Sequence, residues 1–230
     1  MTKIAWLNSV PANQLEAMHI ESESLRQIRQ LVPQGSWSDG EWRVVCRMVH
    51  TCGDPTIAQD IDFMNNPVES GIKALLDGAP IYVDSQMQKA GLSFAKLKAV
   101  QPGFQKDAVC CHVADDDVAQ LAKTEGKARS LFAIRKAKHM LHGGIVSIGN
   151  APVALLELNR MIIEENIRPA LVLGVPVGFV HVEESKQELA SLPVSGIILK
   201  GRRGGSALAV AALHALAIQA IQPDNTKEFS

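Results

Sequence analysis

The sequence is poor in aromatic residues and has no long uninterrupted apolar run. Aromatics make up 4% of the 230 residues while 47% are hydrophobic, so Ala, Val, Leu and Ile must fill the core. Small and branched side chains of this kind suit helices packed closely on a sheet. The most apolar stretch, Pro169–Val182, is interrupted by glycine and proline and is shorter than the ~20 residues that span a bilayer. We therefore expect no membrane-spanning segment and no membrane partner.

Runs of like charge are also missing. The formal net charge is -1 and the pI is about 6.7, with acidic and basic residues interspersed. Such a chain has no basic surface for nucleic acid, so we expect no nucleic-acid partner. Near the start, only Ile4–Leu7 is apolar before polar residues follow, which is too short for a signal peptide. We expect a cytoplasmic protein.

Motifs for common cofactors and nucleophiles are absent. No G-x-x-x-x-G-K-[ST] loop, no G-x-G-x-x-G after a strand and no G-x-S-x-G elbow occurs, which argues against nucleotide cofactors and a hydrolase triad. His139 and His142 are three apart, but no second ligand pair has zinc spacing. We expect no cofactor and no protein-bound metal. The four cysteines lack a C-x-x-C pair and are expected to be reduced, buried side chains: Cys46, Cys52, Cys110 and Cys111.

The chain divides by pattern into three parts. Residues 1–19 show no periodicity and are expected to be an extension that packs loosely or on a partner. Residues 20–222 contain no linker and no repeat, so they are expected to form one domain. Residues 223–230 form a polar tail.

Within the predicted domain, short apolar runs alternate with helix-length segments. The runs are Pro80–Val83, Ala108–Val113, Gly144–Ile148, Ala170–Leu173 and Gly196–Leu199. The helical segments lie near 115–141, 152–165, 182–191 and 205–220. This alternation predicts an α/β fold, with a mainly parallel sheet covered by helices on both faces.

Three of the predicted strands lead into glycine-containing loops: SIGNAP (Ser147–Pro152), LGVPVGF (Leu173–Phe179) and LKGRRGGSA (Leu199–Ala207). Ligands of open parallel sheets bind outside the carboxyl ends of the strands, where glycine permits close backbone approach. We expect the functional site at this edge.

An earlier helix is marked at both ends. Ser38 and Glu41 have the spacing of a capping box, and Trp37 and Trp42 that of a hydrophobic staple. Gly53 can adopt the left-handed conformation that ends a helix. The pattern predicts a helix from Ser38 to near Thr51.

One face of that helix carries Arg43, Arg47 and His50 within about 60° of one another. Spacing alone favours a solvated charged face with an incidental histidine. His50 lies in the last turn, where the helix dipole favours imidazolium, whereas Arg47 opposes it. A nearby anionic ligand would favour the protonated ring and make His50 a proton donor.

Two further features of the sequence each allow more than one interpretation. Arg202 and Arg203 in GRRGGSA fit an anion-binding loop and an ordinary turn with exposed arginines equally well. His214, among Ala, Val and Leu on the last helix, is expected to be a core or interface histidine.

Four blocks together resemble the signature blocks of the precorrin-8X methylmutase family, in family order. They are RMVHTCGD (Arg47–Asp54), GNAPVAL (Gly149–Leu155), LGVPVGFVHVEESK (Leu173–Lys186) and GRRGGSA (Gly201–Ala207). The resemblance covers most of the chain from Ile20 to Ala217.

The resemblance implies an isomerase of cobalamin biosynthesis that moves a methyl group from C-11 to C-12 of precorrin-8X or cobalt-precorrin-8, giving hydrogenobyrinate or cobyrinate. It implies that His50 is the general acid and that Ser24, Arg47 and Arg129 contact the corrinoid substrate. Arginine suits the forked pairing that the many substrate carboxylates require. The resemblance also implies a homodimer with the site near the subunit interface.

Two rival functions remain. A non-catalytic corrinoid-binding carrier would use the same pocket and would release product only up to one equivalent. A phosphate-binding enzyme that uses GRRGGSA would be thermally stabilised by phosphate esters and not by hydrogenobyrinate.

Overall fold

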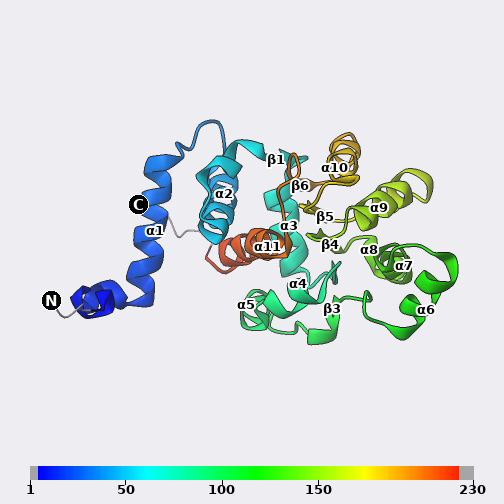
Figure 1. Cartoon of the computed structure of the whole chain (residues 1–230), viewed down its shortest axis with the longest axis horizontal. Coiled ribbons are helices and arrows are strands. Elements are labelled where there is room, and N and C mark those ends of the chain that lie inside the picture. Colours follow the sequence, from blue (N-terminus) through cyan, green and yellow to red (C-terminus); the bar gives the residue numbers. More distant parts are fainter. Residues whose placement is uncertain (1–4, 223–230) are drawn as a thin grey trace.

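A six-stranded sheet lies at the centre of the protein, with helices on both of its faces (Figure 1). The computed structural model describes residues 5–222. The expected polar tail and the first four residues of the expected extension lie outside the described residues. The strand order is β1-β6-β5-β4-β2-β3. The predicted α/β fold with helices on both faces is confirmed.

The five predicted strands are present and parallel to one another, and a sixth was missed. The strands are β1 (Ile61–Met64), β2 (Ile81–Val83), β3 (Val109–Cys110), β4 (Ile145–Ile148), β5 (Leu171–Gly174) and β6 (Gly196–Leu199). Every residue of β4, β5 and β6 is buried, because helices cover both faces, and this explains their continuous apolar runs. The missed strand β1 is short, lies at the edge and pairs antiparallel with β6.

The last helix, α11, is the centre of one face. This face carries α2 (Asp39–Cys52), α3 (Pro67–Leu76), α4 (Gln86–Gly91), α5 (Phe94–Val100) and α11 (Ser206–Ile221). The other four helices, together with β4 and β5, contact α11 (Figure 1). Packing within the chain therefore accounts for the apolar character of α11, which gives no sign of a subunit interface.

The other face carries helices from the middle of the chain. They are α7 (Arg129–Lys136), α8 (Lys138–Leu141), α9 (Pro152–Glu164) and α10 (Val182–Ala190), with α6 (Asp116–Glu125) packed on α7. The helical segment predicted near 115–141 is thus three helices. Gly126 ends α6 with a φ of 64°, a left-handed conformation that glycine adopts without strain.

Helix α1 (Ala17–Leu31) lies at the margin of the molecule and packs mainly on α2 (Figure 1). Its buried contacts are made by Leu25, Ile28 and Val32. Short 3-10 turns complete the chain: η1 (Trp6–Ser9), η2 (Ala12–Leu15), η3 (Pro55–Asp60) and η4 (Lys106–Ala108). Within residues 5–222, no helix combines the length and the apolar character needed to cross a membrane.

The predicted ends of α2 are confirmed. The Ser38 hydroxyl accepts from the backbone N–H of Glu41, whose carboxylate accepts from the backbone N–H of Ser38. The rings of Trp37 and Trp42 stack with centroids 5.7 Å apart. Gly53 has a φ of 69° and follows the last helical residue, Cys52.

All four cysteines are free, but only two are the buried side chains that were expected. Cys46 and Cys111 are buried, whereas Cys52 is exposed and Cys110 is partly exposed. The expectation was wrong for Cys52 because α2 ends there, at the surface.

His214 is a core histidine in its neutral form. Its Nε2 accepts a hydrogen bond of 2.9 Å from the backbone N–H of Ser93. Burial, together with the positive charges of Lys96 and Arg47, lowers the pKa of His214 from 6.5 to about 4. Between these two values the unfolded chain binds a proton that the folded chain does not, so stability is lost as the pH falls through this window.

We expect His214→Gln, which keeps an acceptor for Ser93, to flatten the pH dependence of stability. Between pH 7 and about 4, the free energy of unfolding should fall by about 1–2 kcal/mol more in the wild type than in the variant. The difference is no larger because the His214 ring is partly exposed. Urea denaturation across this range measures the difference. Parallel curves for the two proteins would show that His214 does not titrate as stated.

Candidate active site

The last turn of α2 lies at the carboxyl edge of the parallel strands. Helix α2 leads through η3 into β1, and β1 runs antiparallel to β6. As a result, Ile61 at the start of β1 pairs with Leu199 at the end of β6. His50 is therefore at the edge where the glycine-containing loops emerge.

Ser24 and His50 are in direct contact. The Ser24 Oγ and His50 Nδ1 atoms are 2.7 Å apart, within hydrogen-bonding distance. The hydroxyl donates to Nδ1 when this nitrogen carries no proton and accepts from Nδ1–H when it does. In both states Nε2 is left for another group.

Arg47 lies one turn before His50 and forms an ion pair of 2.6 Å with Glu21 of α1. The Arg47 side chain is 18% exposed, whereas that of Glu21 is 45% exposed. The interpretation that spacing alone favoured, a solvated charged face, is therefore wrong. Helix α1 covers this face, so Arg43, Arg47 and His50 are half-buried.

Arg203 joins the GRRGGSA loop to the segment that follows α2. Its guanidinium donates to Asp54 at 2.9 Å, to the Thr56 hydroxyl at 2.6 Å, to the Thr56 carbonyl at 3.2 Å and to Asp60. Hydrogen bonds from Thr56, and then from Arg203, hold the pKa of Asp54 below its usual value. Neighbouring Arg202 pairs with Glu183 at 3.1 Å and lies over the Phe179 ring. Both arginines thus have carboxylate partners within the chain.

Lys186 was missed as a residue of this region. It is 2% exposed, and its Nζ donates to the carbonyls of Gly201 and Arg203, each at 2.8 Å. Burial lowers its pKa to about 8. The signal in the sequence was its place in the LGVPVGFVHVEESK block.

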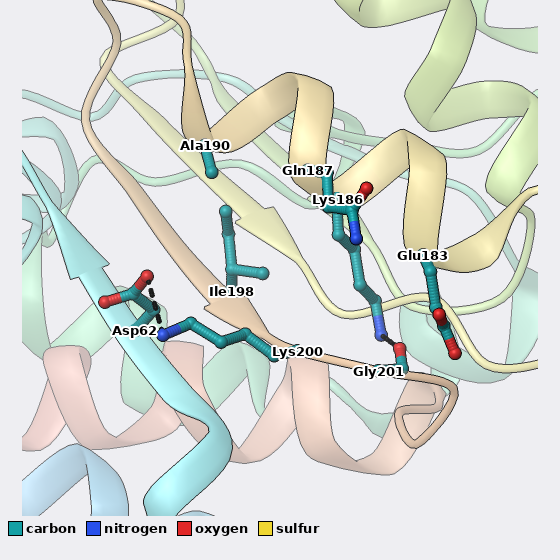
Figure 2. A pocket seen from close by; sticks show the side chains of 8 residues that line it. All are labelled: Asp62, Glu183, Lys186, Gln187, Ala190, Ile198, Lys200 and Gly201. Atoms are coloured by element: carbon teal, nitrogen blue, oxygen red, sulfur yellow. Dashed lines mark hydrogen bonds and ion pairs between the residues drawn. The ribbon is translucent and has the colours of Figure 1, made fainter.

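A pocket of about 180 Å³ lies beside this lysine, between α10, β6 and β1 (Figure 2). Ser24, Arg47 and His50 are not among its lining residues. It is smaller than the ~300–1,000 Å³ of typical ligand sites. It is therefore not the place where a substrate would meet His50.

Asp84, also missed, organises the GNAPVAL loop. Its carboxylate is 1% exposed and accepts from the backbone N–H groups of Gly149, Asn150 and Ala151 at 3.0, 2.9 and 2.6 Å, and from the Gln88 amide. Burial raises the pKa of Asp84, and the backbone N–H groups oppose that rise. Its position directly after the apolar run that forms β2 was a signal in the sequence.

Two loop glycines serve chain packing. A Cβ at Gly204 would lie 2.2 Å from the Val175 carbonyl oxygen, and one at Gly149 would lie 3.0 Å from the Cα of Ser206. Glycine is required there because the loops after β4, β5 and β6 touch one another. Close approach of a ligand is not needed to explain either residue.

Arg129 is not brought to His50 within one chain. It begins α7, on the opposite side of the sheet from α2 (Figure 1). Helix α7 contacts α9, and it leads through α8 to the start of β4 as α9 leads to the start of β5, so both helices end toward the amino edge of the strands. Since α9 begins at the carboxyl edge, so does α7, and Arg129 lies at this edge but far along it from His50.

Comparisons with known proteins agree on one family. The family model described as precorrin-8X methylmutase matches residues 19–219. A cobalt-precorrin-8 methylmutase from Methanocaldococcus jannaschii is 36% identical over 207 residues, which are 87% of this chain and 93% of that protein. A precorrin-8X methylmutase from Pseudomonas aeruginosa is 39% identical over 179 residues, covering 77% and 83% of the two chains. The solved structure of a precorrin-8X methylmutase from Thermus thermophilus has a TM-score of 0.79 and 41% identity, covering 89% of this chain and 96% of that one.

We expect Asp84→Asn to lower the free energy of unfolding by about 2–4 kcal/mol, because an amide NH₂ would face backbone N–H donors in a buried site. Urea denaturation measures the loss. Asp77→Asn, at an exposed ion pair of α3, is the control and should change stability by less than about 0.5 kcal/mol. Equal stabilities of the two variants would contradict the role given to Asp84.

Proposed function

The chain belongs to the precorrin-8X methylmutase family, and we propose that it moves the methyl group of precorrin-8X or cobalt-precorrin-8 from C-11 to C-12 with His50 as general acid. As a member of this family it is an isomerase of cobalamin biosynthesis. The products of the proposed shift are hydrogenobyrinate and cobyrinate. The catalytic domain in this proposal is 20–222, preceded by the extension 1–19.

The observation that carries the proposal is the hydrogen bond between Ser24 and His50. It fixes the ring through Nδ1, so that Nε2–H of the imidazolium can point to the macrocycle and protonate it. After transfer, Nδ1 keeps its proton and still donates to the Ser24 hydroxyl, so the unprotonated nitrogen is Nε2. Since substrate and product are isomers, a proton lost from the rearranged ring restores the imidazolium and balances the reaction.

Arg47 holds a carboxylate of the substrate. In the structure its partner is Glu21, and the more exposed of the two side chains is the glutamate. Glu21 can therefore turn into water, and the cost is that of leaving the half-buried guanidinium without an anion. A substrate carboxylate takes its place on the guanidinium.

Arg129 comes from a second copy of the chain. It begins α7, which lies far from α2 (Figure 1), so a site that uses both Arg129 and His50 needs two protomers. Helix α1, which covers His50, exposes Ile20 and Leu31, and the turns before it expose Trp6 and Leu7. Several exposed apolar side chains on one marginal segment can form a subunit contact. A homodimer would pair two such sites.

We expect His50→Ala to lower kcat by about 10²–10⁴-fold, the usual contribution of a general acid. Conversion of precorrin-8X, followed by its visible absorption, measures the rate. His139→Ala, at an exposed histidine of α8, is the matched control and should keep the wild-type rate. Turnover by His50→Ala at the wild-type rate would remove His50 as the acid. Product limited to one equivalent of wild-type protein would favour the carrier instead.

The two-protomer site predicts complementation between variants. A heterodimer of His50→Ala with Arg129→Ala, isolated through two different tags, has one intact site, while each variant homodimer has none. We expect the heterodimer to show about half of the wild-type activity per dimer. If it is no more active than the two homodimers, Arg129 and His50 do not serve the same site across an interface.

A further inference from the structure

A buried lysine holds the GRRGGSA loop from behind. The Lys186 side chain extends from α10, and its Nζ donates to the carbonyls of Gly201 and Arg203, each at 2.8 Å (Figure 2). These carbonyls belong to the turn between β6 and α11. The amine therefore fixes the backbone of the turn on the side that faces α10.

The same turn is held from its other side by Arg203. The guanidinium donates to Asp54, Thr56 and Asp60, and the backbone N–H of Lys200 donates to the Asp60 carbonyl at 2.8 Å. Asp54 directly follows Gly53, the residue that ends α2. The chain of contacts thus runs from α10 through the turn to the end of the helix that carries His50.

The stability of the fold does not explain a lysine at position 186. Its amine is bonded to carbonyls, and no carboxylate bonds to it directly. The carboxylates that act on its charge are Glu183 on α10 and Asp60 in η3, and the Arg203 guanidinium lies on the turn. In the adjoining pocket, Asp62 and Lys200 pair with each other at 3.2 Å. Desolvation outweighs the attraction of the two acids, so the pKa falls to about 8 and the charged amine is costly to bury. Because Gly201 is exposed and Arg203 partly so, water could bond to both carbonyls if the amine were absent.

We infer that Lys186 and Arg203 are positioning residues, which together brace the last turn of α2 and so hold His50 in place for proton transfer. The inference rests on the proposed function. We call the two side chains and the turn between them the Lys186–Arg203 brace. A displacement of about 1 Å at a reacting group is enough to slow a reaction by about 10²-fold, so a loosened brace should reduce kcat without removing the substrate's binding groups.

The test compares Lys186→Met with Leu189→Ala. Leu189 is buried one turn further along α10, so its truncation loosens the helix without removing a contact to the turn. We expect Lys186→Met to lower kcat at least tenfold, to change KM by less than about threefold and to lower Tm less than Leu189→Ala does. Leu189→Ala should keep kcat near that of the wild type. If Lys186→Met has a kcat within twofold of the wild type, or if the two variants lose kcat in proportion to Tm, the brace does not position His50.

Arg203 provides a second variant pair. Arg203→Met should lower kcat as Lys186→Met does, and Arg203→Lys should recover part of it by pairing with one carboxylate. The double variant Lys186→Met/Arg203→Met should be no slower than the slower single variant, because both act through one turn. Multiplied losses in the double variant would mean that the two residues act separately.

A measurement without turnover separates this inference from the proposed function. Trypsin cuts after Arg202 and Arg203 when the turn opens, and mass spectrometry of the first fragments gives the rate. We expect cleavage there to be several-fold faster in Lys186→Met than in the wild type and in Leu189→Ala. Equal cleavage rates would exclude the brace even if the wild type is active. If Lys186→Met is cleaved faster but the wild type does not turn over precorrin-8X, only the proposed function is rejected.

Discussion

Helix α11 must be buried on nearly every side, and much of the molecule is arranged to satisfy this requirement. Its alanines and leucines leave almost no polar face, so α2, α3, α4 and α5 pack around it while the sheet covers the remaining side (Figure 1). Helix α2 is thereby fixed against α11 with its last turn at the carboxyl edge of the strands. Hydrophobic packing, which is non-directional and strong, thus brings the helix that carries His50 to this edge, and the polar contacts at the end of α2 act on a helix already placed there.

Charge at the carboxyl edge is balanced pair by pair. Arg47 has Glu21, Arg202 has Glu183, and Arg203 has Asp54 and Asp60. A protein of near-zero net charge can in this way hold three arginines at one edge without a basic surface. The pairs differ in exposure: Arg47 is the least exposed of the three arginines, and its acidic partner can leave into water. Lys186 differs from all three because carbonyls hold it, which fits a side chain that fixes backbone.

Much of the fold could be predicted from local pattern. Four of the five parallel strands, all except the edge strand β3, are buried on both faces and so appear as continuous apolar runs. Helix α2 carries its capping box, its staple and Gly53 within one short segment. Strand β1 escaped prediction because an edge strand of four residues forms only through pairing with β6, far along the chain. The sequence pattern predicts one helical segment over 115–141, because the left-handed turn at Gly126 changes the direction of the chain without changing its helical composition.

The α/β class, the family, the edge at which the glycine-containing loops emerge and the face of α2 that carries Arg47 and His50 all follow from the sequence, because each depends on residues close together in the chain or on ordered motifs. The tertiary structure alone decided which partners these residues have. Ser24 meets His50 because α1 folds back over α2, and Arg203 meets Asp54 because β1 runs antiparallel to β6. It also decided that Arg129 lies far from His50 in the same chain, since the sheet separates the helices that carry them (Figure 1). Contacts between segments distant in sequence leave no periodic signal, and only the packing of the whole chain fixes them.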